Sequence, residues 1–279
     1  MNIERRDFLK TTLAASATAA LASHAEAAAP STSATGKREY YELRAYKLKS
    51  PDWRPALEIY FEKAMLPALA RRGIERVGVF TEIAVDKATA TSKPIPEAPV
   101  WVLIPYSSLE TFAEINASLN TDPDVLKAGG DYLHAKKASM AFDRIDSWLL
   151  RAFKTMPAME VPAFAKNKVP TRVYEMRDYE SHSELAALNK MAMFDEGEME
   201  VMRTLGMSPV WFGQALTGPN LPHLRYFTGA PDLATHLANW KKFGPDPRWQ
   251  KMKDDPKWAD NTTRTAPARF LVPTACSQI

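Results

Sequence analysis

Cysteine is nearly absent from this 279-residue chain, which contains only Cys276. A single thiol cannot form an intramolecular disulfide, and a metal site built on several thiolates is excluded with it. A cysteine so close to the end of the chain is also a poor position for a nucleophile. Stability must come from an ordinary core, for which 46% hydrophobic and 25% charged residues are normal.

Charge of one sign and long hydrophobic runs are lacking as well. The formal net charge is +3 and no run of five like charges occurs, so we expect no nucleic-acid partner. The apolar stretch at residues 11–22 is shorter than the roughly 20 residues that cross a bilayer. We expect no membrane span once the N-terminal segment has been removed.

Sequence motifs for several large enzyme classes are missing. The chain has no glycine-rich phosphate loop, no Gly-x-Ser-x-Gly elbow and no Cys-x-x-Cys pair, which disfavours P-loop, dinucleotide and serine-hydrolase functions. The histidines after residue 30 are His134, His182, His223 and His236. None lies three or four residues from a plausible ligand cluster, so no metal site and no cofactor are predicted.

The first residues have the order of an export signal. Residues 4–10 resemble a twin-arginine (Tat) signal, followed by the apolar stretch and by an Ala-x-Ala site at 25–27. The specific part is an arginine pair with two apolar residues behind it: Arg5, Arg6, Phe8 and Leu9. We predict a signal peptide over residues 1–29, recognition by the Tat export machinery, and a bacterial periplasmic or secreted location.

The remaining chain repeats itself. The sequence Tyr-Glu-Leu-Arg at 41–44 recurs as Tyr-Glu-Met-Arg at 174–177, an offset of 133, while Asp-Pro at 122–123 recurs at 246–247, an offset of 124. The first copy therefore carries nine extra residues between these points, and they fall in the proline-containing stretch 84–99. An internal duplication explains both matches at once.

Each copy has the pattern strand, helix, strand, strand, helix, strand. This βαββαβ order is the ferredoxin-like arrangement, whose helices leave one face of the sheet bare. We predict an α+β fold in which two tandem units pack their sheets together as an α/β barrel. The predicted boundaries are 38–153 for the first unit, 154–170 for a linker and 171–274 for the second unit.

Three stretches resemble a known family. They are Tyr-Glu-Leu-Arg-Ala-Tyr at 41–46, Leu-Pro-Ala-Leu at 66–69, and Trp-x-x-Phe-x-x-Asp-Pro-x-Trp at 240–249. Together they look like the NIPSNAP family of the dimeric α/β-barrel superfamily, over about residues 38–274. The first copy is less typical in its second half, where mainly Asp-Pro at 122–123 is kept. The resemblance implies the fold but supplies no catalytic set, and a fold alone does not give a function.

The first strand of each copy carries the candidate site. Because side chains alternate between the faces of a strand, a Glu, an Arg and a Tyr share one face in each copy. The candidates are Glu42, Arg44 and Tyr46, then Glu175, Arg177 and Tyr179. We expect these polar faces to point into the barrel, with Tyr41 and Leu43 packed on the helices. His223, at the start of a later strand, could reach the barrel mouth.

The charged faces have two interpretations. They are either structural Glu–Arg pairs that fix the register of the two halves, or a pocket whose arginines hold an anionic or carbonyl group. Our leading hypothesis is an exported NIPSNAP-like protein that binds a small organic molecule in the barrel between its halves. The alternatives are a cofactor-free monooxygenase-like enzyme and a non-catalytic interaction or assembly protein. A homodimer is compatible with each, although tandem copies do not require one.

Overall fold

The computed structural model describes residues 37–279. The predicted signal peptide, with Arg5, Arg6, Phe8 and Leu9, lies outside the described residues. Two sets of four long strands build the fold, one from each sequence copy. The first set is β1 (Tyr40–Leu48), β2 (Gly78–Asp86), β4 (Val100–Tyr106) and β5 (Phe142–Ala152). The second is β6 (Val173–Glu180), β7 (Pro209–Thr217), β8 (His223–Ala230) and β10 (Arg269–Pro273).

These eight strands close into one antiparallel barrel. Within each half the order is the ferredoxin-like one, β5-β1-β4-β2 and β10-β6-β8-β7. Two further pairings join the halves, since Leu150 on β5 lies opposite Ala215 on β7, and Phe270 on β10 lies opposite Ile83 on β2. The predicted tandem α+β barrel is therefore confirmed, and it is closed by direct pairing of edge strands as well as by packing of the two sheets.

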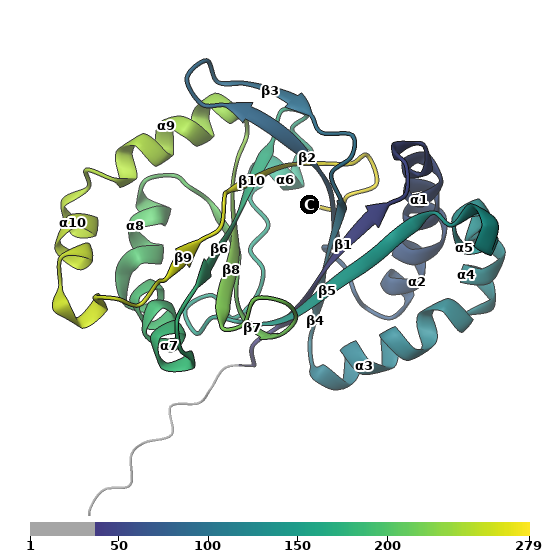
Figure 1. The fold of residues 1–279 in the computed structure, drawn as a ribbon, viewed down its shortest axis with the longest axis horizontal. Helices are drawn as coiled ribbons and strands as arrows, with labels where there is room; N and C mark the ends of the chain where they lie inside the picture. The colour runs from purple at the N-terminus through teal and green to yellow at the C-terminus, as the bar shows by residue number, and fades with distance from the viewer. Residues whose placement is uncertain (1–36) are drawn as a thin grey trace, which may run out of the picture. The chain divides into compact units, whose positions relative to one another are not determined.

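Helices surround the barrel on the outside (Figure 1). The first half supplies α1 (Arg54–Tyr60), α2 (Leu66–Arg71), α3 (Leu109–Ser118), α4 (Pro123–Ala128) and α5 (Gly130–Leu133). The second supplies α7 (Glu184–Met193), α8 (Met199–Thr204), α9 (Leu233–Phe243) and α10 (Pro247–Lys253). A short helix, α6 (Ala163–Lys166), lies in the segment between the halves.

Local sequence signals position these helices. Ser108 and Asp232 cap α3 and α9, because each side chain accepts a hydrogen bond from the backbone N–H three residues on. Gly73 and Gly206 follow α2 and α8 with φ values of +72° and +78°, a conformation that glycine adopts at low cost. Both copies therefore begin and end their helices with equivalent residues.

The barrel interior is filled by side chains from all eight strands. Tyr41, Leu43 and Ala45 of β1 point inward, as do Tyr174 and Met176 of β6. They pack against buried aromatic and aliphatic residues that include Phe80, Trp101, Leu103, Leu150, Trp211, Phe227 and Leu271. A closed interior of this kind accommodates apolar groups and has little room for unpaired charge.

The predicted direction of the first-strand faces is consequently wrong. Glu42, Arg44, Tyr46, Glu175, Arg177 and Tyr179 share faces as expected, but those faces lie on the helix side of the sheet. The physical reason is the supply of partners. Buried charges need hydrogen bonds, and helices α3 and α9 offer amide and imidazole groups to them. The middle of the barrel offers mainly hydrocarbon, and the charged groups that do lie inside, Asp178 and Arg225, are already paired with each other.

The nine-residue insertion of the first copy forms an arm. Strands β2 and β3 (Thr91–Pro94) pair as a hairpin that extends beyond the barrel. Figure 1 shows this hairpin beside α9 of the other half. At its turn Lys87 lies 5.6 Å from the ring centroid of Phe270 on β10, so the insertion carries a residue of the first half onto the second.

Replacing Trp211 by alanine tests the filled interior. Trp211 is 0% exposed, with its ring 5.1 Å from those of Tyr41 and Phe227. We expect a loss of about 3–5 kcal/mol in the free energy of unfolding, because truncation leaves a cavity between the halves. Urea denaturation of the variant measures it. The control is Leu185→Ala at a residue 78% exposed, and an equally small loss in both variants would contradict the packed barrel.

Candidate functional site

In the first half, the Glu–Arg pair is fully closed. Arg44 donates to the Glu42 carboxylate from Nε at 2.7 Å and from Nη2 at 2.9 Å. Tyr106, Asn116 and Ser147 donate to the same carboxylate at 2.9, 3.2 and 3.0 Å. Five hydrogen bonds therefore satisfy a carboxylate that is 3% exposed. This arrangement has the features of a structural ion pair, with neither group left free for a ligand.

The electrostatics of Glu42 agree with that assignment. Burial opposes ionisation of the carboxyl, but Arg44 and the hydrogen bonds from Asn116 and Tyr106 outweigh it and hold the pKa of Glu42 below its ordinary value of 4.5. Tyr46 of the same face is 2% exposed and packs against Phe61 in the core. The first-half candidates thus stabilise the layer between sheet and helices.

In the second half, the equivalent glutamate has a different partner. Glu175 Oε2 lies 2.6 Å from Nε2 of His236 on α9, and both residues are at most 1% exposed. The same imidazole nitrogen lies 3.1 Å from the indole nitrogen of Trp240. One nitrogen cannot donate to the carboxylate and accept from the indole at once, and the shorter, charged contact sets it as the donor.

Arg177 is left without the pairing that Arg44 has. Its Nη1 is 3.6 Å from Glu175 Oε1, beyond hydrogen-bond length, and its buried Nε has no partner among residues 37–279. The guanidinium instead stacks 4.4 Å from the ring centroid of Trp240. Burial disfavours its charge, but Tyr226, Tyr179 and the carboxylates nearby outweigh this effect and raise the pKa of Arg177. Arg177 therefore stays charged, and it keeps N–H donors that are not hydrogen-bonded within residues 37–279.

Three substitutions between the copies explain the difference. By the 124-residue offset, Tyr106, Asn116 and Phe112 of the first half correspond to Ala230, Trp240 and His236 of the second. Two donors to the glutamate are thereby lost, and an imidazole takes their place. The duplicated pair is locked in one copy and opened in the other.

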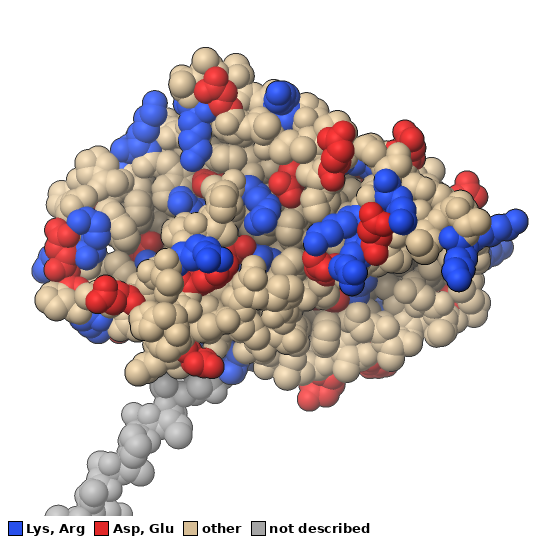
Figure 2. All heavy atoms as spheres, viewed as in Figure 1, with Lys and Arg blue, Asp and Glu red and all other residues tan. Residues whose placement is uncertain are grey.

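A cavity lies where the pair is open. It has a volume of about 250 Å³ and runs between α9, β6 and β10. Its lining is Lys87, Glu175, Arg177, Leu237, Trp240, Lys241 and Phe270. We call this the second-half cleft. Figure 2 shows basic side chains beside α9 and the hairpin arm, at the upper left. Three cations face one carboxylate here, and apolar walls surround them.

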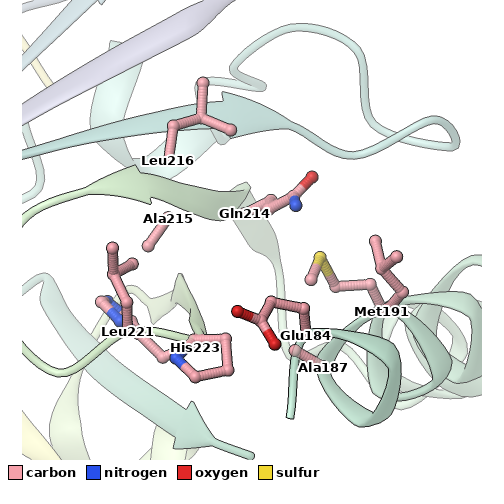
Figure 3. Close-up of a pocket in the computed structure, with 10 residues that line it drawn as sticks. Glu184, Ala187, Met191, Gln214, Ala215, Leu216, Leu221 and His223 are labelled. Atoms are coloured by element: carbon pink, nitrogen blue, oxygen red, sulfur yellow. The ribbon is translucent and has the colours of Figure 1, made fainter. Parts of the chain in front are cut away.

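The remaining candidates lie elsewhere. Tyr179 is partly buried, packs against Phe194 and shares a 3.1 Å hydroxyl contact with Tyr226. It does not line the second-half cleft. His223 lines a different cavity of about 360 Å³ between α7 and the β7–β8 hairpin, whose walls are mostly apolar (Figure 3). Its Nδ1 contacts the backbone carbonyl oxygen of Asn220. Burial lowers the pKa of His223, and the positive charge of Arg225 lowers it further. The structure therefore does not bring His223 together with Glu175 and Arg177.

Sequence reasoning missed most of the cleft wall. Trp240 stands in a recognised motif, yet its spacing indicates helix packing rather than an arginine platform. Lys87 belongs to the insertion, and no pattern connects it with α9. His236 had one detectable signal, because it replaces an apolar residue, Phe112, at the equivalent position of the other copy. Among residues 37–279, no three His, Cys, Asp or Glu side chains gather as a metal-ion group.

Matched arginine variants test whether the two pairs differ. Arg44→Gln should lower the free energy of unfolding by about 3 kcal/mol or more, because Glu42 stays buried and loses its charged partner. Arg177→Gln should cost only about 1 kcal/mol, the size of its cation–π contact, because Glu175 keeps His236. Chemical denaturation of both variants in one buffer gives the comparison, and equal losses would contradict an open pair in the second half.

The pH dependence of the first pair provides a second test. Since the folded state lowers the pKa of Glu42, the ionised group stabilises the fold above its ordinary pKa and loses this contribution as pH falls through the folded-state pKa. The gap in unfolding free energy between wild type and Glu42→Gln should be widest near pH 7 and narrow below about pH 4. Urea titrations across this range measure it, and a constant gap would refute the assignment.

Family models match both ends of the chain. Residues 174–278 match NIPSNAP, and residues 2–22 match the twin-arginine translocation pathway signal sequence. No curated protein matches the chain.

Several solved structures are similar to this chain at low sequence identity. A candidate monooxygenase from Lactobacillus acidophilus NCFM is 8% identical, with 85% of this chain and 94% of that chain covered and a TM-score of 0.48. A second, from Fusobacterium nucleatum, is 10% identical over 85% and 93%, with a TM-score of 0.49. An uncharacterised NIPSNAP-like domain protein from Burkholderia xenovorans is 16% identical over 38% and 87%, with a TM-score of 0.34.

The NIPSNAP match includes the Trp-x-x-Phe-x-x-Asp-Pro-x-Trp motif at 240–249, one of the three stretches that carried the resemblance. The other two, at 41–46 and 66–69, lie outside the matched range. Over residues 37–279 the structure has no helix with the length and apolar character of a membrane span. Residues 174–278 thus resemble the NIPSNAP family, in a chain whose twin-arginine signal indicates export across the cytoplasmic membrane.

Proposed function

We propose that this exported NIPSNAP-like protein binds a small organic anion in the second-half cleft and does so in the bacterial periplasm. The observation that carries the proposal is Arg177, a charged guanidinium that stacks on Trp240 and has no hydrogen-bonded carboxylate within the part of the chain that the structure describes. An arginine held in this way presents its donors to a carboxylate or carbonyl group. Lys87 and Lys241 add positive charge at the same opening.

The location of the site differs from the barrel interior that the sequence suggested. The interior is packed with aromatic side chains, whereas the cleft combines apolar walls with a few convergent polar groups, as small-molecule sites do. Duplication supports the same choice. In the first copy the Glu–Arg pair is closed by hydrogen bonds and serves the fold. The corresponding pair of the second copy lacks those bonds, so its arginine does not have the same structural role.

Binding and turnover are separate questions for this cleft. Glu175 lines the cleft and contacts the buried imidazole of His236 behind it, and a carboxylate–imidazole contact can move protons when a substrate lies beside it. The binding proposal does not depend on that chemistry. A ligand recovered unchanged from the protein favours a binding protein, and a ligand that is converted favours an enzyme.

Native mass spectrometry on protein purified from the periplasm, with its own signal, is the first experiment. Wild type is also titrated with acetate, benzoate and 3-phenylpropionate at up to millimolar concentration, followed by tryptophan fluorescence. We expect saturable binding of at least one aromatic carboxylate. Arg177→Gln should weaken it by about 10- to 100-fold, because a hydrogen bond to a charged group contributes roughly 1.5–3 kcal/mol.

The matched control is Arg248→Gln, which removes an arginine of α10 that is 51% exposed and paired with Asp246, the residue that caps this helix. This variant should bind as wild type does. Unchanged binding in Arg177→Gln, or the absence of any bound or added organic anion in wild type, would contradict the proposed site.

A further inference from the structure

The floor of the second-half cleft offers a donor and an acceptor side by side. Arg177 Nη1 and Glu175 Oε1 lie 3.6 Å apart without a hydrogen bond. In the first half the corresponding groups are locked together at 2.7 and 2.9 Å. The second-half pair has therefore opened enough to leave one charged donor and one carboxylate oxygen available to the same ligand, while His236 holds the other oxygen.

We infer that the ligand is a 2-hydroxy carboxylic acid with a flat apolar remainder. Its carboxylate would accept from Arg177, and its neighbouring hydroxyl would donate to Glu175 Oε1. A simple carboxylate satisfies only the arginine and leaves the glutamate facing a second anion, which is unfavourable in a partly buried site. A group with adjacent acceptor and donor satisfies both residues at once. This inference rests on the proposed function.

The walls of the cleft define the rest of the molecule. Trp240 and Phe270 present rings, and Leu237 adds an aliphatic surface. Such walls suit a planar apolar group. The volume of about 250 Å³ restricts the ligand to a small molecule.

The surrounding charge favours a hydroxyl over an ammonium group as the second donor. Lys87, Arg177 and Lys241 line the cleft against the single carboxylate of Glu175. An amino acid would bring a further cation into this surrounding, while a hydroxy acid brings only its carboxylate. The arm that carries Lys87 also comes from the first half, so both sequence copies contribute to the charge that selects the ligand.

Three matched probes test the inference: 3-phenylpropionate, 3-phenyllactate and phenylalanine. The first two share a ring and a carboxylate and differ only in the hydroxyl group. Isothermal titration of wild type should give at least tenfold tighter binding of 3-phenyllactate than of 3-phenylpropionate, with phenylalanine weaker than 3-phenyllactate. Equal binding of the first two acids overturns the inference and leaves the proposed function standing. Failure of all three to bind overturns both.

A variant then assigns the discrimination to Glu175. Glu175→Met keeps a similar shape and removes the acceptor, so the preference for the hydroxyl should fall to less than threefold while 3-phenylpropionate still binds. A thermal melt checks that the variant is folded. If it is not folded, the titration of wild type with the three probes alone tests the inference. Retention of the full preference in the folded variant would show that another group reads the hydroxyl.

Discussion

Edge-to-edge pairing between the halves is the constraint on which the remaining structure depends. Each half alone is a four-stranded sheet with one bare face and two free edges, a state that exposes apolar surface and unpaired backbone groups. The β5–β7 and β10–β2 pairings remove all four edges together, and closure brings both bare faces into one interior. Tyr41, Trp211 and Phe227 can be fully buried only because both seams are made.

Closure also decides where charge can lie. Aromatic packing fills the middle of the interior, and Asp178 and Arg225 within it already pair with each other. The Glu and Arg of each first strand lie instead on the face that packs against helices. There they need partners, and the first half provides Asn116 and Tyr106 to complete a locked pair. The second half has lost those groups, so Arg177 is stabilised by aromatic rings and by carboxylates that do not fully engage it. The same constraint that makes one pair structural makes the other available.

Much of the fold could be read from the sequence, because duplication, helix caps and the order of elements are local or periodic signals. Which face of β1 points inward could not. Alternation shows that Glu42 and Arg44 share a face, but both faces of this sheet are buried, so polarity does not distinguish inside from outside. The cleft was only half predictable for a similar reason. Glu175 and Arg177 stand in the repeat, whereas Lys87 reaches them through a hairpin whose direction is set by tertiary structure.

Further charged side chains are buried near the second-half cleft, and they help to keep the partly buried Arg177 charged. By the 133-residue offset, Lys190 and Glu198 replace Leu57 and Met65 of the first half, and they form a buried 2.7 Å ion pair. The Glu198 carboxylate is among the groups that raise the pKa of Arg177, although burial raises the pKa of Glu198 itself against the pull of Lys190 and Arg177. Such substitutions replace apolar packing with groups that are costly to bury. Their concentration beside the open pair, in one copy only, fits selection for a charged guanidinium at the cleft better than a need of the fold, which the first copy meets with leucine and methionine.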